Sequence, residues 1–198
     1  MLSLVRLWAA RDAEDALGYL YELGDSLPRT TSVIEIGRIL TATDPTAAMD
    51  ISHDFPAGPD RDYCAGQVMQ AWAMRDGAAA ARWLAQQPPD SQPPDLEVAL
   101  AGGWARVAPS QAAQFVSDHL PAGPNQTKAA AAVAMVWAKE DARSAGDWSL
   151  TFPKGEIQNG MLRVVLSYWK ARNQPEMERW ISALDPDALQ TVRPLLPR

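Results

Sequence analysis

Two stretches of the sequence decide the fold, because they carry the same pattern. Residues 72–88 read WAMRDGAAAARWLAQQP, and residues 137–153 read WAKEDARSAGDWSLTFP. A Trp-Ala pair, an aspartate, an alanine, a second tryptophan and a proline stand at the same places in both. Such a match between distant stretches indicates an internal repeat, in which each copy forms the same small structural unit.

The pattern extends along the chain with a period of 32 or 33 residues. The first place of successive units holds Trp8, Leu40, Trp72, Trp104, Trp137 and Trp169. The second place, 11 residues later, holds Tyr19, Ile51, Trp83, Phe115, Trp148 and Trp180. All eight tryptophans of the chain therefore fall at one of two places in a unit.

Each unit is expected to be a pair of helices, called here the A helix and the B helix. A short polar residue four places after the first aromatic is typical of a helix N-cap, whose side chain accepts hydrogen bonds from free backbone N–H groups. The residues at this place are Asp12, Asp44, Asp76, Ala108, Asp141 and Asn173, so five of six can cap. A Pro-x-Gly element after the second aromatic is expected to end the B helix and to lead into the next A helix.

The A helix has an apolar stripe at helical spacing, at eight, four and one residues before the first aromatic and at that aromatic itself. The place four residues before holds Ile36, Val68, Leu100, Val133 and Val165. The helices expected from these signals span 2–10, 13–23, 29–42, 45–54, 60–75, 77–87, 94–107, 109–119, 125–139, 142–150, 156–171, 174–184 and 187–193.

The sequence therefore predicts an all-α fold. We expect an α-solenoid, a right-handed α-α superhelix of about six antiparallel helix pairs. Residues 1–198 are expected to form a single helical-repeat domain, with residues 186–198 as a C-terminal cap. Its first repeat is expected to be truncated at the N-terminus, because only seven residues precede Trp8.

Composition excludes several classes of protein. The chain has 198 residues, a net charge of −6 and an isoelectric point near 4.9, which disfavours nucleic-acid binding. No apolar run approaches the roughly 20 residues of a membrane span, so no membrane contact is expected. No signal peptide is recognisable within these residues, and the compartment and oligomeric state stay open. A single cysteine excludes an intrachain disulfide.

The repeat pattern resembles bacterial helical-repeat proteins that are grouped with the tetratricopeptide-like and HEAT-like solenoids. The resemblance covers residues 1–185 and rests on Trp72, Ala73, Asp76, Ala80, Trp83, Pro88 and their equivalents in other units. It does not extend to tetratricopeptide repeats proper, whose tryptophan lies early in the first helix. The resemblance implies partner binding on a curved surface, and fold alone does not fix function.

Residues that could support catalysis or metal binding are few. His53 and His119 lie two units apart near the ends of B helices, so they are not expected to share a metal. Cys64 falls on the apolar stripe and is expected to be an inert, buried thiol. The repeated aspartates are interpreted as caps rather than as catalytic carboxylates. We therefore expect no catalytic residue, no metal site and no cofactor.

The leading hypothesis is a non-catalytic scaffold that binds a protein or peptide on its concave face. Its contacts are expected at A-helix positions five and two residues before, and two residues after, the first aromatic. These positions include Glu35, Arg38, Gln67, Gln70, Met74, Arg106, Met135 and Lys139. Plain solvent exposure explains the same residues. The alternative function is a helical-repeat enzyme or a regulatory segment of a larger enzyme.

Charge is distributed unevenly along the chain. Residues 1–99 hold 15 acidic and 7 basic residues, whereas residues 100–198 hold 9 acidic and 11 basic residues. Such a difference could orient a charged partner, and an ordinary solvated surface gives the same pattern.

Overall fold

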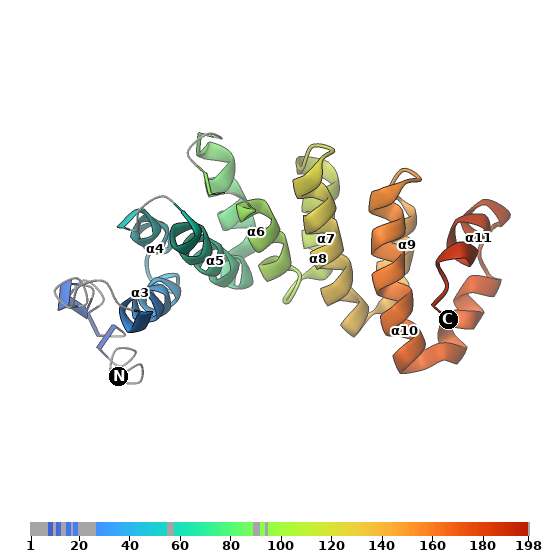
Figure 1. The fold of residues 1–198 in the computed structure, drawn as a ribbon, viewed down its shortest axis with the longest axis horizontal. Coiled ribbons are helices and arrows are strands. Elements are labelled where there is room, and N and C mark those ends of the chain that lie inside the picture. The colour runs from blue at the N-terminus through green and yellow to red at the C-terminus, as the bar shows by residue number, and fades with distance from the viewer. Residues whose placement is uncertain are drawn as a thin grey trace. The chain divides into compact units, whose positions relative to one another are not determined.

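The computed structural model describes residues 8–9, 11–12, 15–16, 18–19, 27–54, 58–88, 92–93 and 95–197. In these residues the regular secondary structure is entirely helical, with no strand, which confirms the all-α prediction (Figure 1). The chain divides into two compact units, Met1–Gly103 and Trp104–Arg198, and each is described by itself.

The N-terminal unit contains α3 (Leu27–Leu40), α4 (Pro45–Asp50), the 3₁₀ helix η1 (Ile51–Asp54), α5 (Pro59–Gln86) and α6 (Leu96–Trp104) up to Gly103. The C-terminal unit contains α7 (Pro109–His119), α8 (Pro124–Glu140), α9 (Ala142–Leu150), α10 (Glu156–Ser182), α11 (Pro186–Val192) and the 3₁₀ helix η3 (Arg193–Leu195). Most predicted boundaries from residue 29 onward agree to within about three residues. Most of the predicted helices 2–10 and 13–23, and so the truncated first repeat, lie outside the described residues.

The predicted caps are confirmed wherever the structure describes them. Asp76 interrupts α5 with φ −149° and ψ 86°, and Asn173 interrupts α10 with φ −154° and ψ 72°. The Asp76 carboxylate accepts a hydrogen bond from Ala79 N at 2.8 Å, and Asp141 accepts one from Ser144 N at 2.9 Å. Ala108 adopts the same backbone conformation without a side-chain bond, at φ −148° and ψ 71°. Each long helix α5 or α10 is therefore an A helix and a B helix separated by one extended residue.

The chain folds back at each cap, because the two aromatics of a unit are in contact. The ring centroids of Trp72 and Trp83 are 5.6 Å apart, and those of Trp137 and Trp148 are 5.9 Å apart. Eleven residues along a straight helix would separate them by about 16 Å. The same tilted contact joins Trp8 to Tyr19, Trp104 to Phe115, and Trp169 to Trp180, at 5.4, 6.0 and 5.4 Å.

The core follows the predicted stripe at two of its positions. All residues eight and four places before the first aromatic are buried, from Ser32 and Ile36 to Met161 and Val165. The position one place before is only partly buried in four of five described units, which corrects the prediction. The residue after the aromatic is buried instead, as Ala73, Ala105 and Ala138. A small side chain there suits the close approach of a neighbouring helix.

The tryptophans are not equally buried. Trp72 is 5% exposed, whereas Trp104 and Trp137 are only partly buried. Trp180 is buried because its ring lies directly on Gly146, where an added Cβ would come within 3.0 Å of the indole. The equivalent ring of Trp148 stays partly exposed and reaches Ser117 Oγ at 3.2 Å. Equal repeat positions therefore do not guarantee equal environments.

Glycine is required at three places for two different reasons, backbone conformation and close helix packing. Gly58 and Gly155, at the starts of α5 and α10, have φ of 148° and 154°, a region that residues with a side chain rarely adopt. Gly103 in α6 instead permits close packing, because a Cβ there would lie 2.5 Å from the Gln70 carbonyl oxygen of α5.

Gly103→Ala should destabilise the protein by about 1–3 kcal/mol, because the new methyl group meets backbone atoms that cannot rotate away. Urea unfolding followed by circular dichroism measures the change. Gly160→Ala in α10 is the matched control, since a Cβ there meets nothing within 4 Å. The control should stabilise by up to about 1 kcal/mol through helix propensity. A stabilised Gly103→Ala variant would contradict the close approach of α6 to α5.

Asp141→Ala should cost about 1 kcal/mol at neutral pH, because it removes the cap of α9. Partial burial raises the pKa of Asp141, but hydrogen bonds from Ser144 outweigh it and lower that pKa below 3.8. The stabilisation is therefore complete above pH 3.8 and is lost as the pH falls through the lowered value. Unfolding at neutral and acidic pH should show the difference between the parent and Asp141→Ala becoming smaller in acid, because the charge-dependent part is lost. Asp141→Asn, which keeps one accepting oxygen and loses the charge, should lie between the parent and Asp141→Ala at neutral pH, and a difference that grows in acid would refute the assignment.

Candidate functional site

Five of the predicted partner-binding residues lie in the N-terminal unit. Arg38 is exposed on α3 and pairs with Glu35, one turn earlier, at 3.3 Å. Gln67 and Gln70 are partly buried on α5, and Met74 is 39% exposed at the end of its A-helix part. The polar side chains here are accessible, but the only contact shown among the five is the exposed pair on α3, which contributes little stability.

The other three predicted residues lie in the C-terminal unit. Arg106 follows α6, Met135 lies on α8 with 48% exposure, and Lys139 is exposed in the last turn of α8. Exposed Met135 is an adaptable apolar contact of the kind used at binding surfaces. The two groups of residues belong to different compact units. That they lie on one common face stays a prediction.

The cysteine and the two histidines considered for chemistry lie in different settings. Cys64 is fully buried, which confirms the expectation of a buried thiol. His119 is exposed and stacks on Phe115 with ring centroids 5.6 Å apart. The side chain of His53 lies outside what the structure describes. Among the described residues, no group of three or more His, Cys, Asp or Glu side chains is placed to hold a metal ion.

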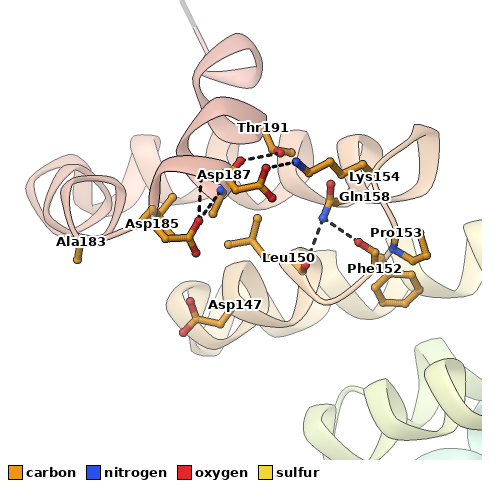
Figure 2. Close-up of a pocket in the computed structure, with 12 residues that line it drawn as sticks. Asp147, Leu150, Phe152, Pro153, Lys154, Gln158, Ala183, Asp185, Asp187 and Thr191 are labelled. Atoms are coloured by element: carbon orange, nitrogen blue, oxygen red, sulfur yellow. Dashed lines mark hydrogen bonds and ion pairs between the residues drawn. The ribbon is translucent and has the colours of Figure 1, made fainter.

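A pocket of about 560 Å³ lies in the C-terminal unit and was not anticipated from the sequence (Figure 2). It is bounded by the end of α9, the turn before α10, the first turn of α10, and the segment that leads into α11. The residues that line it are Asp147, Leu150, Phe152, Pro153, Lys154, Gln158, Ala183, Leu184, Asp185, Asp187, Ala188 and Thr191. We call this the α9–α11 pocket.

Gln158 is the buried polar side chain of the pocket wall, with 3% exposure. Its amide nitrogen donates to the carbonyl oxygens of Leu150 at 3.2 Å and Phe152 at 2.8 Å. These bonds fix the orientation of the amide, so Oε1 faces the opposite way, toward Lys154 and Asp187 in Figure 2. Gln158 Oε1 is buried and has no hydrogen-bond partner. A buried acceptor without a donor is costly.

Three carboxylates and one ammonium group give the pocket a formal charge of −2. Asp147 Oδ1 accepts from Trp180 Nε1 at 2.7 Å. Asp185 Oδ1 caps α11 by accepting from the backbone N–H groups of Asp187 and Ala188, both at 2.9 Å. Asp187 forms an ion pair with Lys154. The carboxylates are therefore held in place by their own hydrogen bonds, while Leu150 and Phe152 supply apolar wall.

The lining residues include no histidine, cysteine or serine, and the Thr191 hydroxyl donates to the Asp187 carbonyl at 3.2 Å. Half of the lining residues are polar or charged and half are apolar.

Two signals in the sequence could have indicated this site. Lys154 lies 33 residues before Asp187, and Asp147 lies 33 residues before Trp180. Each pair is therefore one repeat period apart, and such residues lie side by side when successive units stack. A second signal is the recurrence of Gln92, Gln126 and Gln158 11 or 12 residues before an A-helix tryptophan. All three donate to carbonyls at the end of the preceding B helix.

Gln158→Leu should destabilise the protein by about 1–3 kcal/mol, because the carbonyls of Leu150 and Phe152 lose their donor. Urea unfolding gives the change in free energy. Gln174→Leu is the matched control, since Gln174 is exposed and bonds only to Glu178 on its own helix. The control should change stability by less than about 0.5 kcal/mol. Equal effects of the two substitutions would mean that the Gln158 bonds contribute nothing specific.

Comparison with known proteins adds no assignment: no family model, curated protein or solved structure matches the chain. None of the described helices is both long and apolar enough to cross a bilayer.

Proposed function

We propose that the chain is a non-catalytic helical-repeat protein that binds a protein or peptide partner along the exposed faces of its A helices. The proposal includes an α-solenoid of about six helix pairs, whose A helices line the concave face. The recurrence of one aromatic contact geometry in five helix pairs supports a common way of stacking.

Contacts within the C-terminal unit support the same stacking. The A helix α8 packs against its own B helix α9 and against α10, whose first part is the next A helix. The B helices are joined by side-chain bonds, from Trp148 to Ser117 at 3.2 Å and from Trp180 to Asp147 at 2.7 Å. Each pair thus contacts its neighbours in sequence, as in repeat proteins whose stability is a sum over adjacent units.

The observation that carries the binding proposal is the contrast between two faces of each A helix. Positions eight and four residues before the first aromatic are buried and mostly apolar in every described unit. Positions two residues before and two residues after it are exposed or partly exposed and differ in chemistry, as in Arg38, Met74, Arg106, Met135 and Lys139. Packing constrains the first set and leaves the second set free to suit a partner.

The test replaces Arg38, Gln70, Arg106 and Lys139 together by alanine. Partners are captured on the parent protein from the source cells, identified by mass spectrometry and purified, and their affinities are then measured by calorimetry. The four-alanine variant should bind at least tenfold more weakly, because contacts across the proposed face are removed.

The matched control replaces Arg82, Gln114, Arg143 and Arg179 by alanine, which are exposed residues of B helices with the same loss of charge. The control should bind as tightly as the parent, and circular dichroism should show both variants folded. A folded four-alanine variant with parental affinity would refute the A-helix face as the binding surface. An affinity lost only in the B-helix control would move the surface to the other side.

A further inference from the structure

The A helices of the C-terminal unit are basic, whereas its B helices are acidic. Its A helices are α8 and the part of α10 before Asn173, and together they hold five basic and two acidic residues, a formal charge of +3. Its B helices are α7, α9 and the part of α10 after Asn173, and they hold two basic and four acidic residues, a formal charge of −2. The positive charge therefore gathers on the helices that carry the proposed binding face, in a chain whose net charge is −6.

An exposed stripe runs along α8 and consists of Lys128, Met135 and Lys139. Met135 lies seven residues and Lys139 lies 11 residues after Lys128, and residues at this spacing share one side of a helix. All three side chains are exposed, with Met135 48% exposed. The buried residues of α8, such as Val133 and Ala138, occupy its other side. We call the exposed set the α8 stripe.

The cations of this surface are available to an anionic partner. Lys139 and Arg163 are exposed, and neither forms an ion pair within the part of the chain that the structure describes. Arg163 lies on α10, which packs against α8, and takes the repeat place that Ala131 takes on α8, between Lys128 and Met135. In the stacking proposed above, Arg163 therefore adds positive charge beside the middle of the α8 stripe.

The spacing of the α8 stripe sets the length of its ligand. Eleven residues of helix separate the Cα atoms of Lys128 and Lys139 by about 16 Å, which no single phosphate or carboxylate can span. An extended peptide advances about 3.3 Å per residue, so two carboxylates five residues apart match this distance. Met135 lies about 10 Å from Lys128 along the axis, which suits an apolar residue three places from the first carboxylate.

We propose that the A helices of the C-terminal unit bind an extended acidic peptide, in which two carboxylates pair with Lys128 and Lys139 and an apolar side chain packs on Met135. This inference rests on the proposed function, because it names the chemistry of the partner for the same helices. Charge complementarity favours an acidic partner, and a methionine adapts to apolar side chains of different shape. A nucleic acid is disfavoured, because the chain as a whole carries a charge of −6.

The test titrates the full chain with three short peptides, acetylated and amidated, and follows binding by calorimetry and by ¹⁵N NMR. The first peptide, EALLAE, has carboxylates five residues apart and leucines that suit either direction of binding. QALLAQ removes the charges, and EAAAAE removes the apolar anchor. EALLAE should bind at least tenfold more tightly than QALLAQ, should lose affinity as salt is added, and should shift the backbone amides of α8.

Two variants and one matched control test the assigned residues. Lys128→Gln combined with Lys139→Gln should weaken the binding of EALLAE at least tenfold. The control combines Arg143→Gln with Arg179→Gln, which removes the same charge from exposed B-helix positions and should leave affinity unchanged. Met135→Gln should weaken EALLAE at least threefold and leave EAAAAE unaffected, because only the leucines are expected to contact Met135.

The inference is overturned if EALLAE does not bind at millimolar concentration, if it binds no better than QALLAQ, or if the lysine variant and its control behave alike. Tighter binding of an oligouridylate of similar length would assign the surface to nucleic acid instead. A dimer of the parent that the lysine variant abolishes would assign it to a second copy of the chain. If the lysine variant does not fold, the comparison of EALLAE with QALLAQ on the parent protein decides.

Failure of this inference can be distinguished from failure of the proposed function. If a captured partner depends on the A-helix face and EALLAE does not bind, only the acidic chemistry of the partner is refuted. If EALLAE binds and its shifts fall on α7 and α9 instead of α8, the A-helix face is refuted as well.

Discussion

The contact between two aromatic rings across a capped turn is the interaction on which the rest of the structure depends. An extended residue such as Asp76 breaks the helix and satisfies the new N-terminus with its carboxylate. The ring contact, as between Trp72 and Trp83, then holds the two helices side by side. Because this contact fixes the orientation of the A helix, its positions four and eight residues before the aromatic point together into the core, where Val68 and Cys64 are fully buried.

The helices were predictable because their signals are local. A cap such as Asp141 depends on a few neighbouring residues, and the contact of Trp137 with Trp148 follows from a short turn. The degree of burial was less predictable, because it depends on the neighbouring pair. Trp180 is buried on Gly146, whereas the equivalent Trp148 is partly exposed and bonds to Ser117. A pattern that repeats in sequence cannot reveal such differences between neighbours.

The α9–α11 pocket was missed for the same reason. Its acceptors come from α9, α10 and the segment before α11, so no single stretch of sequence carries the site. What makes Gln158 distinctive is that its amide nitrogen is occupied and its oxygen is buried without a partner, which depends on how the helices pack.

The glutamines that close the B helices also give the chain a polarity. Gln92, Gln126 and Gln158 belong to the pair that follows, yet each donates to carbonyls of the pair before. At these three places a helix pair is therefore completed by its successor. If such units multiply by duplication, a copy inserted before one of these pairs leaves carbonyls of its predecessor without their donor unless it carries a glutamine at the same place.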